Sequence, residues 1–474
     1  TELTHVVRGW TAARSAPART SVVADPACPQ AVVIGAHGAL GLDPPSTRYV
    51  PVHSPTWQSS LPRRLVGSGL VHLSSRIPRD VGARIAVTAN YKITPALSAF
   101  DATTLRGLGV AGMPLPGIDP RETLRTAARH RLPVLRTLAP ISQRRAPPFD
   151  LSGEVIVSTG IADLDGAFSD VALRLARIAW PQMWQAMRAT EALEVQRDLR
   201  ALLMPAMFSG TARAFTAWAR RRGIRLGVLQ HGLYAYRRFT GADRGADMVM
   251  AWGDGVEGQA RDWGGPPAAF RTIGSPSVQQ TAVVRTRSRR VRRVLLTTTG
   301  PFLESVIFPT AVHDIFLKDV LAGIKVMQRN GIQVALRVAP SETPDRYRHA
   351  LDTAGVAISL ADRVPIGEAI TQHDLLVCPL SSVALEASAL GVPVLMGLPS
   401  MPPDFAHEHL VAPWSTSLPG VFHDSAEFLA LVDGIAGQNP PAIAMGLELA
   451  SHLREYAQPF DADAFMSALR ELST

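Results

Sequence analysis

The segment 291–437 constrains the fold most strongly, because short apolar runs and helix-forming runs alternate along it. Strand-like runs are Val294–Thr297, Gln333–Val338, Ala357–Leu360, Leu375–Leu380 and Pro393–Leu398. Helical segments are expected near residues 310–330, 344–354, 365–373, 382–391 and 425–437. Apolar strands separated by helix-length segments are typical of a parallel sheet with helices on both faces. The pattern therefore predicts a doubly wound α/β domain.

The first 275 residues show the same alternation less regularly. Buried strands are predicted at Ala31–Ile34, Arg84–Thr88, Val134–Leu138, Glu154–Ser158, Leu226–Leu229 and Met248–Ala251. Helices are predicted over about 167–203, at Thr211–Arg222 and at Ala462–Leu472. This pattern indicates a second α/β domain.

A chain of 474 residues is too long for one ordinary core. We expect an N-terminal α/β domain over 1–275, an arginine-rich linker over 276–290 and a second α/β domain over 291–455. The last segment, 456–474, is expected to form a helix that packs back on the first domain.

The composition, with 46% hydrophobic and 19% charged residues, fits a globular protein. The sequence contains no run of 18 apolar residues, and Thr1–His5 lacks the basic and apolar regions of a signal peptide. Its two cysteines, Cys28 and Cys378, cannot form a disulfide framework and lack partners at metal spacing. The expected location is the cytoplasm, with attachment to a membrane surface as an alternative.

The net charge of +8 comes almost entirely from arginine, and the densest basic run is Arg285–Arg293. A basic run can bind nucleic acid or an anionic membrane surface, but a solvated interdomain linker is the favoured interpretation. Because no nucleic-acid motif accompanies the run, no nucleic-acid partner is expected.

The run Leu375–Glu386 is a strand that leads into a helix, with Pro379, Ser381 and Ser382 at the junction. A helix N-terminus favours an anion such as a phosphate. Glu386 lies one helical turn beyond Ser382, on the same face. Serines that hold a phosphate and a glutamate that holds a ribose would together bind a nucleotide. The alternative for Glu386 is a carboxylate that stabilises the helix N-terminus.

Gln230-His231-Gly232 follows another predicted strand. An imidazole at the carboxyl end of a strand, beside a glycine that lets a ligand approach the backbone, can accept a proton or contact a phosphate. A turn histidine bonded to a backbone carbonyl is the competing interpretation.

Four motifs follow one another in an order that resembles bacterial surface-carbohydrate glycosyltransferases of the GT-B fold. The motifs are Gln230-His231-Gly232, Trp252-Gly253, Gly274-Ser275-Pro276 and the block Ser381-Ser382, Glu386 and Gly391-Val392-Pro393. The families it resembles are the capsule polysaccharide transferases and the CDP-glycerol glycerophosphotransferases. The resemblance covers roughly residues 224–400.

This resemblance implies two Rossmann-like domains that face each other across a cleft, with the nucleotide donor on the C-terminal domain and the acceptor on the N-terminal one. It places the donor phosphates at Ser381 and Ser382 and the ribose at Glu386. Thr298, Thr299 and Gly300 would form a second polar loop at the phosphates. His231 would face the reacting centre, with Gln230 and Gly232 lining the cleft. The resemblance implies no metal. It implies no cofactor either, because the nucleotide-sugar is a co-substrate.

One position departs from these families. They often carry a His-Pro pair where this chain has Ala339-Pro340. Arg337 can supply positive charge nearby, or its side chain can point to the other face of the strand. The identity of the nucleotide, including a CMP- or CDP-linked donor, is therefore left open.

Two further segments offer weaker motifs. The loop Gly35–Gly41 follows a predicted strand and contains His37, a second candidate base, although an ordinary turn explains it equally well. Asp163-Leu164-Asp165 looks like a metal-binding Asp-x-Asp, but a solvated loop is the favoured interpretation, since GT-B enzymes do not generally use that motif.

The function expected from these residues is transfer of a sugar, or a sugar-like group, from a nucleotide-activated donor to a hydroxyl or amine acceptor. Surface polysaccharide and natural-product biosynthesis fit equally well. The alternatives are a nucleotide-sugar epimerase of the same fold and a non-catalytic GT-B-like binding or scaffold subunit.

Overall fold

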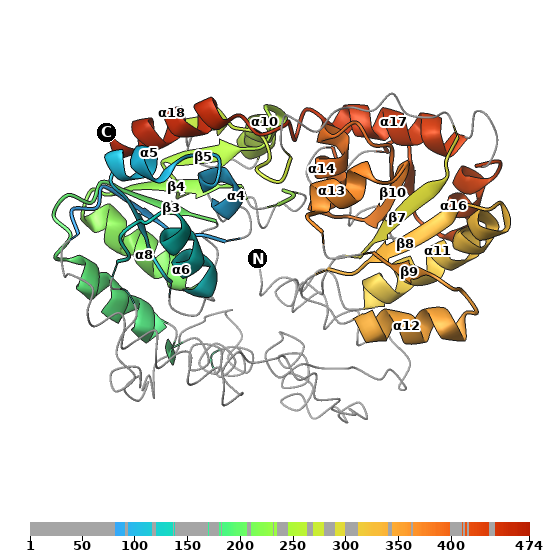
Figure 1. Cartoon of the computed structure of the whole chain (residues 1–474), viewed down its shortest axis with the longest axis horizontal. Helices are drawn as coiled ribbons and strands as arrows, with labels where there is room; N and C mark the ends of the chain where they lie inside the picture. The colour runs from blue at the N-terminus through green and yellow to red at the C-terminus, as the bar shows by residue number, and fades with distance from the viewer. Residues whose placement is uncertain are drawn as a thin grey trace. The chain divides into compact units, whose positions relative to one another are not determined.

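The computed structural model describes residues 81–90, 93–115, 120–135, 137, 169, 180–181, 183–205, 210–230, 232–234, 245–262, 269–278, 290–298, 311–339, 344–361, 364–398, 410, 413–414, 417–435 and 441–474. Residues 78–137, 190–301 and 310–474 belong to one compact unit, which contains two separate β-sheets (Figure 1).

The first sheet has six strands in the order β2-β1-β3-β4-β5-β6. Their bounds are β1 Ile85–Val87, β2 Val110–Gly112, β3 Ala201–Met204, β4 Arg225–Leu229, β5 Met248–Ala251 and β6 Ala269–Thr272. Every pairing in this sheet is parallel. The helices between these strands include α4 Ile93–Leu97, α5 Ala102–Gly107, α6 Pro120–Arg129, α8 Gly210–Arg221 and α10 Gly255–Asp262, and residues 183–193 are helical as well. The strands predicted near β1, β4 and β5 are confirmed.

Three strands of the first sheet, β2, β3 and β6, were not expected from the sequence. The predicted helix over 167–203 is wrong at its end, because residues 201–204 form β3. All four side chains of β3 are buried, so the strand shows no alternation, and its alanine, leucines and methionine favour helix locally. At the predicted strand Val134–Leu138, Val134 makes an isolated parallel bridge to Gly112. The predicted strands Ala31–Ile34 and Glu154–Ser158 lie outside the described residues.

The second sheet has six parallel strands in the order β12-β11-β10-β7-β8-β9. Their bounds are β7 Arg293–Thr297, β8 Gln333–Arg337, β9 Ser359–Leu360, β10 Leu375–Pro379, β11 Val394–Gly397 and β12 Val421–Phe422. The accompanying helices are α11 Ala311–Arg329, α12 Pro344–Thr353, α13 Ile366–Thr371, α14 Ser382–Ala389, α16 Ser425–Val432 and α17 Pro441–Leu453. Every strand and helix predicted in 291–437 is confirmed to within a few residues.

Different helices cover the two faces of the second sheet. Leu296, Leu336 and Val377 belong to the hydrophobic core that also contains residues of α11, α12 and α16. The buried residues of α14, in the part of the chain that the structure describes, are not in that core. Figure 1 shows α13 and α14 on the other side of β7 and β10. The protein is thus an α/β protein with two helix-covered parallel sheets, as predicted.

The last helix, α18 Ala462–Ser473, crosses back to the first sheet and lies against β4, β5 and β6 (Figure 1). Phe465, Leu469 and Leu472 are buried in the core of that sheet. Two separate parallel sheets with covering helices are what the GT-B resemblance implies. The domain boundaries themselves stay predictions, and most of the arginine-rich segment 276–290 lies outside the described residues.

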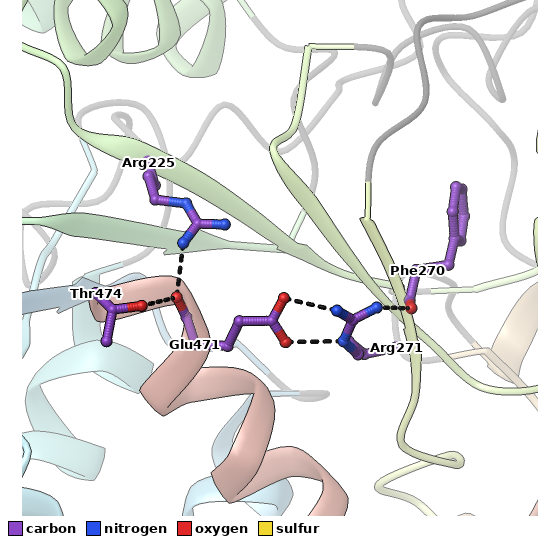
Figure 2. A network of polar contacts seen from close by, with 5 residues as sticks. All are labelled: Arg225, Phe270, Arg271, Glu471 and Thr474. Atoms are coloured by element: carbon purple, nitrogen blue, oxygen red, sulfur yellow. Dashed lines mark hydrogen bonds and ion pairs between the residues drawn. The ribbon is translucent and has the colours of Figure 1, made fainter.

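Figure 2 shows how two arginines of the first sheet hold the end of α18. Arg225 donates a 2.7 Å hydrogen bond to the carbonyl of Glu471, and Arg271 donates two, of 2.8 and 2.7 Å, to the Glu471 carboxylate. A cation is favourable at a helix C-terminus. Since the Arg271 and Glu471 side chains are both more than a third exposed to solvent, the pair adds little stability and mainly fixes the position of the helix.

Candidate active site

The carboxyl edge of the second sheet brings together most of the donor-binding residues predicted from the sequence. The strand order reverses between β7 and β10, which lie side by side. Ligands of open parallel sheets bind outside the carboxyl ends of the strands at such a reversal. Thr298 follows β7, Ser381 follows β10, and Arg337 ends β8, the next strand along.

Ser381 is the N-cap of α14. Its backbone is extended, and its hydroxyl accepts a 3.4 Å hydrogen bond from the backbone N–H of Val383. A capping serine fixes where the helix begins, so Ser382 becomes its first residue. The N-terminal amides of α14 and the positive end of its dipole therefore point toward the carboxyl edge of the sheet, where an anion would be stabilised.

Glu386 is covered by the protein, with 1% of its surface exposed, although it lies only one turn into α14. Among the described residues, it is the one Asp, Glu, Lys or Arg that is fully buried. A buried carboxylate is costly unless a positive charge or hydrogen bonds compensate it. Its surroundings must therefore supply that compensation.

Arg337 supplies positive charge on the same face of the sheet. It pairs in register with Thr297 of β7, and paired residues of neighbouring strands point to the same face. The neighbouring pair, Leu296 and Leu336, faces the core formed with α11, so Thr297 and Arg337 face the α14 side. Burial lowers the pKa of the Arg337 guanidinium, and the negative charge of Glu386 opposes that shift. The sequence had left the direction of Arg337 open; the register settles it.

Thr298 organises the loops that leave β7 and β8. Its backbone N–H donates to the carbonyl of Arg337 at 3.1 Å, and its hydroxyl accepts from the backbone N–H of Ala339 at 2.9 Å. Ala339 stands where the resembling families often have a histidine, so in this chain the position contributes a backbone contact. Thr299 and Gly300, the other predicted residues of this loop, lie outside the described residues.

Thr297 lies at this edge, although it is not among the donor-binding residues predicted from the sequence. It is 2% exposed, and its hydroxyl has no hydrogen-bond partner among the described residues. A buried hydroxyl without a partner is unfavourable. Its signal in the sequence is weak, because it reads as the last residue of an apolar strand.

Gln230 holds the loop at the end of β4. Its side-chain oxygen accepts a 2.7 Å bond from the backbone N–H of Trp252, and its side-chain nitrogen donates a 2.9 Å bond to the carbonyl of Gly232. Gln230 is 1% exposed, so a buried side chain links Gly232 to the residue that follows β5. A Cβ placed on Gly232 would lie 3.9 Å from the Cβ of Ser382, so this loop approaches the start of α14 within the same compact unit. His231 and His37, the two predicted catalytic residues, lie outside the described residues.

The glycines of the Trp-Gly and Gly-Ser-Pro motifs contact the segment that leads from α17 to α18. A Cβ on Gly253 would stand 2.3 Å from the carbonyl oxygen of Glu455. One on Gly274, whose φ is +73°, would stand 2.0 Å from the carbonyl oxygen of Pro459. Only glycine allows backbones to approach so closely. These two motifs therefore dock the C-terminal segment, and their glycines have a structural explanation.

The described residues contain no cluster of three or more His, Cys, Asp or Glu side chains able to hold a metal ion. The Asp163–Asp165 pair lies outside them, so the expectation of a metal-independent site without a cofactor stays a prediction. In the part of the chain that the structure covers, no helix has both the length and the apolar character needed to span a bilayer.

A cavity of about 240 Å³ opens elsewhere, at the amino-terminal ends of β7 and β8, and its lining includes Arg293, Gln333 and His373. Burial lowers the pKa of His373, whose Nδ1 lies 2.7 Å from the carbonyl oxygen of Ala369. None of the predicted donor-binding residues lines this cavity. It lies at the wrong end of the strands for a ligand of a parallel sheet.

No protein-family model matches this chain, and no curated protein does. Several solved structures are similar to it. The UDP-GlcNAc 2-epimerase from Neisseria meningitidis bound to UDP-GlcNAc is 11% identical, with a TM-score of 0.48 over 82% of this chain and 100% of the other. MurG from Acinetobacter baumannii is 12% identical, with a TM-score of 0.42 over 83% and 100%. The wall teichoic acid polymerase TagF is 11% identical, with a TM-score of 0.44 over 87% and 94%.

All three neighbours are enzymes of the GT-B fold, which is the fold that the sequence motifs resemble. Each identity is below 25% and each TM-score is below 0.5. These likenesses therefore add nothing about the reaction or the substrates of this chain, and its fold class rests on the two sheets.

Proposed function

We propose that this protein transfers a glycosyl, or sugar-like, group from a nucleotide-activated donor to a hydroxyl or amine acceptor. The observation that supports this most is the convergence of Ser381, Ser382 and Arg337 at the strand-order reversal of the second sheet. A capped helix N-terminus and a guanidinium at one edge form a site for a diphosphate.

The donor would bind with its phosphates at the N-terminus of α14. As the bond to the sugar breaks, negative charge grows on the departing nucleotide. The backbone amide of Ser382, the α14 dipole and Arg337 would stabilise that charge without having to reorganise. We propose that these groups replace a metal ion in this role, and that the nucleotide-sugar is a co-substrate with no further cofactor.

The acceptor would bind on the side of the first sheet, at the loop that Gln230 holds. His231 is the proposed base that takes the acceptor proton, with His37 as the second candidate. Much of the rate would come from holding donor and acceptor in line, because alignment removes the entropy cost of bringing two molecules together. We further propose a cytoplasmic location, with the arginine-rich run as the place where a membrane surface would be met.

A thermal-shift screen of the purified chain against UDP, GDP, CDP, CMP and dTDP tests the first step. A ligand that binds the folded state alone raises the midpoint, by about 2.7 kcal/mol of added stability at a concentration of 100 times its Kd. We expect a clear shift with one nucleoside diphosphate and a smaller shift with its nucleoside. A chain that responds to none of the five would contradict a nucleotide-dependent function.

Incubation with the matching nucleotide-sugar then separates the reactions. Release of the nucleotide only when an acceptor mixture is added supports a transferase. A new sugar epimer formed from the donor alone would show an epimerase. Tight binding with no turnover under either condition would show a binding or scaffold subunit. The last two outcomes would each overturn the transferase proposal.

A further inference from the structure

The sequence resemblance assigns Glu386 to the ribose of the donor, but its surroundings suit a different role. It is buried to 1% exposure in α14, and the Arg337 guanidinium carries the opposite charge on the same face of the sheet. A carboxylate that has left water binds most favourably to a guanidinium, which offers several N–H donors in a fixed planar arrangement.

We propose that Glu386 holds and orients Arg337, and that Arg337, not Glu386, meets the donor at its diphosphate. This inference rests on the proposed function, since it concerns the same donor. It makes Glu386 a positioning residue and Arg337 a phosphate ligand. The expected ligand chemistry is a nucleoside diphosphate, whose two phosphates match a guanidinium beside a helix N-terminus.

The position of Arg337 supports this assignment. It is the last residue of β8, on the face that α14 covers, and its own carbonyl accepts the backbone N–H of Thr298. The strand end is therefore fixed by the loop from β7, while the side chain is half-buried. An arginine remains charged throughout the physiological pH range, even when burial lowers its pKa. It can thus attract phosphates without depending on pH.

The test separates the nucleoside part of the ligand from its phosphates. The probes are the diphosphate selected by the screen and its own nucleoside, titrated calorimetrically into the wild type and into Arg337→Gln, Glu386→Gln and the double variant. Loss of a hydrogen bond to a charged group weakens binding by about 10- to 100-fold. We expect each single variant to lose that much for the diphosphate and less than about twofold for the nucleoside.

The double variant tests whether the two residues act together. If Glu386 acts through Arg337, the double variant binds the diphosphate no more weakly than Arg337→Gln alone, because coupled residues are not additive. If Glu386 contacts the ribose, Glu386→Gln weakens the nucleoside as much as the diphosphate, and the two losses multiply in the double variant. That second result would overturn the inference.

Arg329→Gln is the matched control. Arg329 is the exposed last residue of α11, which leads into the amino-terminal end of β8, so the same loss of charge away from the carboxyl edge should leave both affinities unchanged. If Glu386→Gln does not fold, Glu386→Asp keeps the charge but moves it, and should still weaken the diphosphate selectively. A wild type that binds no diphosphate would refute the proposed function itself, whereas loss of nucleoside binding in Glu386→Gln would refute only this inference.

Discussion

Among single residues, the proposed base His231 gives the most direct prediction about catalysis. The oxygen and the nitrogen of the Gln230 side chain each bond a backbone group, at Trp252 and at Gly232. If His231 is the base, His231→Ala should lower turnover by about 100-fold or more, because general base catalysis contributes on that scale. The affinity for the nucleotide should stay unchanged, since the proposed donor site lies at the second sheet. Turnover and donor affinity measured on one preparation check this, and full activity of the variant would show that His231 is not the base.

His130, which follows α6, gives the fold a dependence on pH. It is 6% exposed, and its Nε2 has no hydrogen-bond partner among the described residues. Burial lowers the pKa of the His130 imidazole, and the charge of Arg129 lowers it further. The folded state therefore favours the neutral ring.

Because the folded state disfavours the charged ring, a fall in pH should destabilise the protein. In the unfolded chain the ring has its ordinary pKa of about 6.5. The stability that the neutral His130 ring contributes is therefore fully present above that pH. It is lost as the pH falls toward the lower pKa of the folded state. Below pH 6.5 the wild type should lose up to about 1.4 kcal/mol per pH unit relative to His130→Phe.

Urea unfolding of both proteins at pH 7.5 and 5.5 measures this difference. His373, whose pKa burial also lowers, is present in both, so its contribution cancels. An equal pH dependence of the two proteins would contradict the assignment.

At the scale of elements, the segment between α17 and α18 joins the two halves of the compact unit. The Arg454 side chain donates a hydrogen bond to the carbonyl of Ser388, near the end of α14. The carbonyl of Glu455 accepts a hydrogen bond from the backbone N–H of Gly255, the first residue of α10. A few residues further on, Gln458 pairs with Trp252 and Ser275 through their backbones. The segment thus contacts both α14, which begins at Ser382, and Trp252, the residue after β5 that Gln230 also bonds.

Gly274→Ala tests how much this docking contributes. Alanine would be strained at a φ of +73°, and its Cβ would also overlap the carbonyl oxygen of Pro459. Gly331→Ala is the control, because Gly331 has the same φ of +73° and no atom within 4 Å of an added Cβ. Gly331→Ala should cost about 1–2 kcal/mol of unfolding free energy from backbone strain alone. Gly274→Ala should cost at least about 2 kcal/mol more from the steric overlap. Urea denaturation of the two variants measures the difference, and equal losses would show that the docking is not tight.

For the molecule as a whole, the sequence predicted helices and strands best where glycines and prolines separate the buried apolar segments. In 291–437, glycines and prolines separate short apolar strands from helices, so elements such as β10 and α14 could be located almost to the residue. β3 could not, because its residues favour helix locally and only pairing with β1 and β4 makes them a strand.

The sequence located the candidate site in the chain better than it assigned a role to each residue there. The strand-to-helix junction at Ser381 is a local pattern, and the helix cap there is local as well. The direction of Arg337 depends on its register with Thr297, and the tasks of Gly253 and Gly274 depend on partners far along the chain. Such long-range pairings are not encoded in any short window of sequence.

The central claim is that a nucleotide-activated donor binds at the carboxyl edge of the second sheet. A crystal structure with the nucleoside diphosphate chosen by the thermal-shift screen tests it most directly. We predict that the phosphates lie within hydrogen-bond distance of the backbone amide of Ser382 and of the Arg337 guanidinium. A diphosphate bound elsewhere, for example in the cavity beside Arg293 and His373, would contradict the account.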